Sequence, residues 1–191
     1  MNRSTIMSAL LTIQLTSVPA GAETDYLNLP GPIIFQDQTF SLAWSSRPSD
    51  GYAKHEYVPQ GQKLETFSDM FLVEAVTGAI TPGQAAKQQI EALEARKSGD
   101  PLLNYELLEN RATGEIILDF LVSDMKGDTR VEWNAYRYVT LDGGGVGLFA
   151  ISRRAYGEDG AKPFLAGLMS TRAASIEALA RYDIPDIQLK E

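Results

Sequence analysis

An arginine and aromatic pattern in the second half of the chain is the strongest candidate for a binding site. Residues 133–138 read Trp-Asn-Ala-Tyr-Arg-Tyr, and the next predicted strand ends in a pair of arginines and a tyrosine. Arginine together with tyrosine or tryptophan is enriched at binding hot spots, and a guanidinium clamps a carboxylate through two parallel hydrogen bonds. The pattern therefore predicts a site for a partner protein or a small ligand. Its residues are Trp133, Tyr136, Arg137, Tyr138, Arg153, Arg154 and Tyr156.

Side chains alternate between the two faces of a strand, and this alternation decides how these residues are shared out. Trp133 and Arg137 belong to one face of the predicted strand, and Tyr136 and Tyr138 belong to the other. If the next strand pairs with this one, Arg137 and one of the later arginines form a cationic spot flanked by aromatic rings. The alternative is an outer sheet face with cross-strand ion pairs to Glu115, Asp119 or Glu132.

His55 is the single histidine of the chain. A histidine acts as a general base near neutral pH, and a hydrolase would add a serine nucleophile and an orienting carboxylate. Ser45, Ser46 and Ser49 lie across the predicted hairpin, but no G-x-S-x-G nucleophile motif is present. A histidine of the strand or of a binding surface is the favoured interpretation. His55 therefore joins the predicted binding residues, and no catalytic residue is assigned.

Composition and spacing disfavour metal and cofactor sites. With no cysteine and one histidine, Cys-ligated and His-rich metal sites are excluded. The segment Asp124–Asp128 offers oxygen ligands for Ca²⁺, but Lys126 stands where a ligand belongs and no glutamate closes a twelve-residue loop. The glycine run 143–147 lacks phosphate-loop spacing and precedes a predicted strand instead of a helix. We expect neither a metal nor a cofactor.

The first half of the chain is predicted to place His55 in a β-hairpin. Alternating apolar residues indicate strands at 33–44 and 52–58, joined through turn residues at 47–51. A short helix at 64–69 is expected before a strand at 70–76. Thr81, Pro82 and Gln84 form a capping box with proline in the first turn, which predicts a helix that runs to about residue 97.

The second half is predicted to place the arginine and aromatic pattern in an antiparallel meander. Residues 102–110 form a strand or a helical turn. Strands at 115–123, 129–140 and 146–154 follow one another at near-hairpin spacing. A last helix runs from Pro163 to about Tyr182, because apolar residues recur there at the helical period.

These elements predict an α+β fold, since runs of strands are interrupted by two helices. We expect an antiparallel β-sheet of about five to six strands, made of the N-terminal hairpin and the C-terminal meander and packed by two main α-helices. No repeat or linker divides the chain. Residues 23–191 are therefore predicted to form a single soluble domain.

Residues 1–22 have the pattern of a secretory signal peptide. Arg3 supplies positive charge, an apolar stretch follows from Ile6 to Val18, and Ala20 and Ala22 suit a cleavage site. The stretch is too short to cross a bilayer, and no later run is long enough, so we expect no membrane span in the mature form. The lack of cysteine favours a bacterial protein that is periplasmic or secreted.

The favoured function is that of an exported, non-enzymatic binding or accessory protein, which recognises a partner protein or a small ligand through the aromatic and arginine sheet face. A net charge of −8 argues against nucleic acid, because phosphates require clustered basic residues. Two alternatives stay open. One is a small secreted hydrolase that uses His55 with a serine and a carboxylate, and the other is a subunit of an envelope assembly, for which an exposed edge strand would be the sign.

Overall fold

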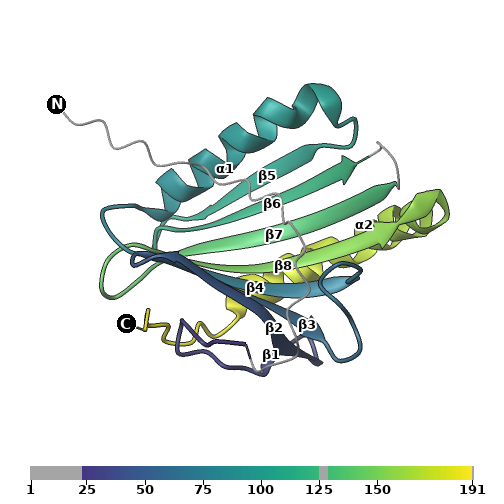
Figure 1. Cartoon of the computed structure of the whole chain (residues 1–191). Coiled ribbons are helices and arrows are strands. Elements are labelled where there is room, and N and C mark those ends of the chain that lie inside the picture. The colour runs from purple at the N-terminus through teal and green to yellow at the C-terminus, as the bar shows by residue number, and fades with distance from the viewer. Residues whose placement is uncertain (1–22, 125–128, 191) are drawn as a thin grey trace.

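The computed structural model describes residues 23–124 and 129–190. The predicted signal peptide at 1–22 and residues 125–128 of the calcium candidate therefore lie outside the described residues. One antiparallel sheet of eight strands, curved into a half-barrel, dominates the described part (Figure 1). The strands are β1 (Ile33–Phe35), β2 (Gln38–Ser49), β3 (Tyr52–Pro59), β4 (Asp69–Val76), β5 (Asn104–Asn110), β6 (Glu115–Asp124), β7 (Arg130–Thr140) and β8 (Val146–Tyr156).

The strand order across the sheet is β1-β2-β3-β4-β8-β7-β6-β5. The two halves of the chain therefore meet where β4 pairs with β8. A helix follows each run of four strands. Helix α1 (Pro82–Arg96) continues into a short 3₁₀ turn, η1 (Lys97–Gly99), and α2 (Gly157–Arg181) follows β8. Among the described residues, neither helix is both long and apolar enough to cross a membrane.

The prediction of a five- to six-stranded sheet packed by two helices is wrong, because the chain forms a single eight-stranded half-barrel sheet. The strand expected at 33–44 is divided at Gln36 and Asp37, whose φ angles of 47° and 61° reverse the chain between β1 and β2. Residues 102–110 provide an edge strand, β5. The short helix expected at 64–69 is a turn region, and α2 begins at Gly157, six residues before the expected Pro163.

The hairpin, the meander and the first helix are confirmed. β2 pairs with β3, and β6, β7 and β8 pair in sequence order. The Thr81 hydroxyl accepts a hydrogen bond from the Gln84 amide, while the Gln84 side chain accepts one from the Thr81 amide. This capping box satisfies amide groups that the first helical turn leaves without a partner, which is why α1 begins at Pro82.

The two helices cover opposite faces of the sheet (Figure 1). Leu168 and Leu179 of α2 pack with Trp133 and with the other strand side chains that point to the same side of the sheet. We call this side the α2 face. Ala86 and Leu93 of α1 pack with a second apolar cluster on the side that we call the α1 face. The main strand contacts of α1 are with β6 and β7. Helix α1 therefore does not cover the part of the α1 face that β3 and β4 form.

Candidate functional site

The structure divides the predicted binding residues between the two faces of the sheet. Trp133, Arg137 and Arg153 lie on the α2 face, where His55 also points. Tyr136, Tyr138, Arg154 and Tyr156 have the opposite parity and lie on the α1 face. The predicted pattern is therefore two separate groups of side chains, each of which has its own contacts.

Arg137 on the α2 face is buried and holds the end of α2. Its Nη1 donates to the carbonyl oxygens of Leu179 and Tyr182 at 2.9 and 2.8 Å. Its Nε and Nη2 donate to the Glu115 carboxylate at 3.0–3.2 Å. The Leu179 carbonyl also accepts from the Tyr182 amide, and the helix ends there, so the guanidinium acts as a C-terminal cap. All of its donor groups face protein acceptors, which confirms the cross-strand pair to Glu115.

Trp133 is also a structural residue of the α2 face. Its indole N–H donates to the buried Asp119, which in turn accepts from the Arg172 guanidinium of α2. Arg153 stacks over the Trp133 ring at 5.5 Å and donates to the Ser175 hydroxyl at 2.9 Å. Arg153 and Trp133 are in contact, and both help to join α2 to the sheet. Trp133 is only 1% exposed.

His55 is buried in the α2 face, and both ring nitrogens have partners. Nε2 accepts from the Tyr26 amide at 3.0 Å, and Nδ1 lies 2.9 Å from the Tyr57 hydroxyl. That hydroxyl donates to the Leu29 carbonyl, so Nδ1 carries the proton and His55 is the neutral tautomer. Burial lowers the pKa of His55 below its usual 6.5, since the charged form would lose its hydration. In the described part of the chain, no serine hydroxyl or carboxylate bonds to this ring.

A polar group of side chains occupies the α1 face where β3, β4, β8 and β7 lie side by side. We call it the α1-face cluster. Its members are Tyr52, Lys54, Glu56, Glu74, Glu132, Asn134, Tyr136, Tyr138, Ser152 and Arg154. The strand register places these side chains in rows across the strands. In one row, Leu148 lies between Tyr138 and Glu74. The neighbouring row runs in the order Tyr136, Ala150, Leu72 and Glu56.

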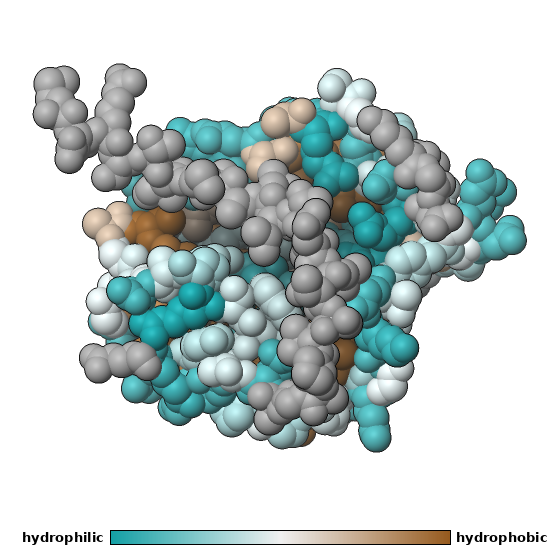
Figure 2. All heavy atoms as spheres, viewed as in Figure 1, coloured by the Kyte–Doolittle hydropathy of each residue, from teal (hydrophilic) through white to brown (hydrophobic). Residues whose placement is uncertain are grey.

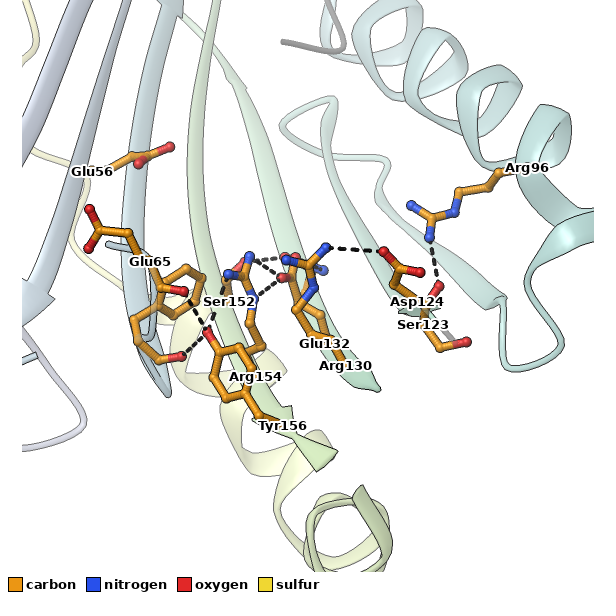
Figure 3. A network of polar contacts seen from close by, with 12 residues as sticks. Glu56, Glu65, Arg96, Ser123, Asp124, Arg130, Glu132, Ser152, Arg154 and Tyr156 are labelled. Atoms are coloured by element: carbon orange, nitrogen blue, oxygen red, sulfur yellow. Dashed lines mark hydrogen bonds and ion pairs between the residues drawn. The ribbon is translucent and has the colours of Figure 1, made fainter. Parts of the chain in front are cut away.

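One end of the cluster is a fixed ion-pair network (Figure 3). Arg154 donates through Nε and Nη2 to Glu132 at 2.5 Å and lies 4.0 Å over the Phe67 ring. Glu132 also accepts from Asn134 at 3.1 Å, and Asn134 accepts from the Ser152 hydroxyl. This pairing confirms the expected cross-strand partner Glu132. Because one cation faces one carboxylate, this end carries no surplus charge.

The other end of the cluster has more carboxylates than cations. Lys54 contacts Glu56 at 2.9 Å and Glu74 at 3.8 Å, and its ammonium lies 6.0 Å over the Trp44 ring. The Tyr52 hydroxyl donates to Glu74 at 3.1 Å. Burial raises the pKa of Glu74, although Lys54 and Tyr52 act in the opposite direction. The Glu56 carboxylate extends over the same face of the sheet (Figure 3).

Lys54 keeps its charge in this surrounding. Burial alone would lower its pKa, but Glu74 and Glu56 outweigh that effect and raise it above the ordinary value. The end of the cluster at Lys54 therefore combines one ammonium with two carboxylates, of which Glu74 is poorly solvated.

Two tyrosine hydroxyls lie between these ends without a protein partner. In the described part of the chain, no group forms a hydrogen bond with the hydroxyl of Tyr136 or Tyr138. In the described residues, the only buried side-chain nitrogen or oxygen without a partner is Arg47 Nε, so the two hydroxyl oxygens keep some contact with solvent although Tyr138 is only 5% exposed. Burial, followed by the charge of Glu74, raises the pKa of both phenols, which keeps them neutral donors. The arrangement offers hydrogen-bonding groups to a bound molecule.

Several members of the cluster were missed by sequence reasoning. Lys54 and Glu56 alternate on one face of their strand, and Glu74 is the only charged residue in the apolar run 70–76. These were usable signals. What brings the residues to Tyr136 is the pairing of β4 with β8, which no local pattern encodes.

The described residues contain no group of acidic and histidine side chains arranged to hold a metal ion. Residues 27–184 match the model of a protein family that is uncharacterised. No curated protein and no solved structure gives a match.

Proposed function

We propose that this chain, which belongs to the uncharacterised family whose model matches residues 27–184, is a non-enzymatic binding protein that holds a small ligand on the α1 face of its sheet. The carrying observation is the pair of partnerless hydroxyls on Tyr136 and Tyr138 beside the charged groups of the α1-face cluster. Of the predicted binding set, we retain Tyr136 and Tyr138, because Arg154 is paired with Glu132 and the Tyr156 hydroxyl donates to the Phe67 carbonyl.

Energetics support the choice of this face. Because the two hydroxyls have no protein partner, a ligand can bond to them without breaking a protein hydrogen bond, and each such bond contributes about 1 kcal/mol. The arginines of the α2 face have no such unused capacity. Arg137 bonds to two carbonyls and a carboxylate, and Arg153 bonds to Ser175 and Gln36.

The hydrolase alternative finds little support in the geometry of His55. A general base needs a ring nitrogen that can accept a proton from the nucleophile. Nε2 of His55 already accepts from a backbone amide, and Nδ1 is held by a tyrosine. We assign His55 the role of joining the segment at Tyr26 to β3.

Export to the periplasm, or secretion from there, is part of the proposal. It is supported by the charge, apolar length and small residues of segment 1–22. Mass spectrometry of the protein from a fractionated bacterial expression host tests it. The proposal expects a chain that begins at Glu23 in the periplasmic or medium fraction. A chain that keeps residues 1–22 and stays in the cytosol would contradict it.

One observation favours a second candidate, a subunit of an envelope assembly. β5 is an outer strand of the sheet, and Leu107 and Leu108 on it are 46% and 40% exposed. An exposed edge strand offers unpaired backbone groups to another strand. Size-exclusion chromatography distinguishes the two, since assembly predicts a larger species that Leu107→Lys reduces to a monomer. A monomer at all concentrations would remove this candidate.

The binding proposal is tested with three probes of equal chain length: n-butylammonium, 1-butanol and butyrate. NMR titration of the full chain is expected to show saturable shifts of β4 and β7 amide signals with at least one probe. Tyr138→Phe should weaken that binding about five- to tenfold, since one hydrogen bond is worth roughly 1 kcal/mol. Tyr105→Phe on β5 is the matched control and should leave binding unchanged. If none of the three probes produces saturable shifts, the proposal is wrong.

A further inference from the structure

We propose that the α1-face cluster selects an organic cation, a small alkylammonium compound, with Glu74 as its counter-ion and the hydroxyls of Tyr136 and Tyr138 as further hydrogen-bonding groups. Because this inference rests on the proposed function, it adds the class of ligand to that same site. It is carried by charge balance, by the strand register and by the partnerless hydroxyls.

Charge balance favours a cation. Glu132 is neutralised by Arg154, with which it shares two contacts at 2.5 Å. Lys54 is shared by Glu56 and Glu74, so one negative charge at that end has no cation of its own. A ligand ammonium would supply the missing charge. A ligand carboxylate would instead face two carboxylates at close range, and that repulsion is strong where water is scarce.

The register of the strands places the groups that would receive the ammonium. Tyr138, Leu148 and Glu74 form one row across β7, β8 and β4, so the tyrosine and the carboxylate are about 10 Å apart at the backbone. Their side chains leave the same face. The row alongside contains Tyr136, Ala150, Leu72 and Glu56. Leu148, Ala150 and Leu72 separate these polar groups and belong to the apolar cluster of the same face.

The hydroxyls provide an observation that is independent of the charge. Tyr138 is 95% buried, and in the described part of the chain its hydroxyl bonds to nothing. The rings of Tyr136 and Tyr138 lie 6.3 Å apart between centroids, and burial, followed by the charge of Glu74, raises the pKa of both phenols. A phenol oxygen accepts an N–H of an ammonium, while its O–H is free to donate. Burial also raises the pKa of Glu74, and Lys54 and Tyr52 offset this effect only in part.

The three probes of equal length separate charge from shape. Dissociation constants from NMR titration of the full chain should rank n-butylammonium as the tightest, at least tenfold tighter than 1-butanol, with butyrate the weakest. Glu74→Gln should weaken the ammonium at least fivefold and leave 1-butanol unchanged. Glu109→Gln on the exposed strand β5 is the matched control. If Glu74→Gln fails to fold, Glu56→Gln provides the same test from the other carboxylate.

The outcomes separate this inference from the proposed function. Equal or tighter binding of 1-butanol or butyrate overturns the cation inference and leaves the binding function standing. Ammonium binding that Glu74→Gln and Glu56→Gln leave unchanged also overturns it, because the cation then lies elsewhere. Loss of binding for all three probes overturns both.

Discussion

Replacing Arg137 by methionine should destabilise the fold far more than an exposed arginine substitution. The change deletes donors to the Leu179 and Tyr182 carbonyls and to Glu115. Breaking a buried ion pair costs about 3–5 kcal/mol. Because the Glu115 side chain is 26% exposed and can turn toward water, the lower end, about 3 kcal/mol, is expected. For a domain of this size that loss lowers the Tm by roughly 6–12 °C.

Urea unfolding followed by circular dichroism measures the effect. The matched control is Arg181→Gln, which removes an i,i+4 pair with Glu177 whose side chains are 79% and 61% exposed. Exposed pairs of this kind contribute less than about 1 kcal/mol. If Arg137→Met and Arg181→Gln lowered the free energy of unfolding equally, the capping role assigned to Arg137 would be refuted.

Four further perturbations follow from the contacts. Gly145→Ala should lower the free energy of unfolding in urea by at least about 2 kcal/mol, since the φ of Gly145 is +103° and a Cβ would meet the Val76 carbonyl oxygen. Gly143→Ala is the control: the space around Gly143 is open, so the loss should be under about 1 kcal/mol. Asp119→Ala should cost about 3 kcal/mol, because the Trp133 indole N–H and Arg172 lose their buried acceptor; a loss no larger than that of Glu106→Gln would contradict this. Tyr138→Phe should leave the Tm within about 2 °C of the parent, since the hydroxyl has no protein partner, and a large drop would show that it has one. Burial lowers the pKa of His55 in the folded state, so the stability that neutral His55 contributes is full above pH 6.5 and is lost as the pH falls toward the folded pKa. The difference in unfolding free energy between the parent and His55→Gln should therefore shrink on acidification. A constant difference would contradict the assignment.

Local patterns predicted those elements whose signals are local. The capping box at Thr81 identifies the start of α1, and the alternation in 115–154 identifies the meander. The division between β1 and β2 escaped because two non-glycine residues, Gln36 and Asp37, take positive φ there. Residues 102–110 stayed open between a strand and a helical turn because nearly all residues of β5 are exposed, so the segment lacks the apolar alternation of a covered strand.

The candidate site was predictable only in part. Tyr136 and Tyr138 share a face as their spacing requires, and Arg154 pairs with Glu132 as expected for neighbouring strands. Arg137 and Arg154 lie on opposite faces of the sheet, which follows from the same alternation of side chains. The contribution of Lys54 and Glu74 depends on the pairing of β4 with β8, which joins residues 70 to 84 positions apart. Such pairing is decided by the whole sheet and not by any one segment.

Beneath the start of α1 the space-filling view shows apolar side chains beside a largely polar surface (Figure 2).

The most direct test of the central claim is a tyrosine-specific NMR titration. In the full chain with ¹³C-labelled tyrosine rings, addition of n-butylammonium should shift the Cζ signals of Tyr136 and Tyr138 along one saturation curve. The signals of Tyr26 and Tyr182 on the α2 face should not move. If Tyr136 and Tyr138 stayed fixed while the probe bound, or if the α2-face tyrosines moved instead, the α1 face would not be the binding site.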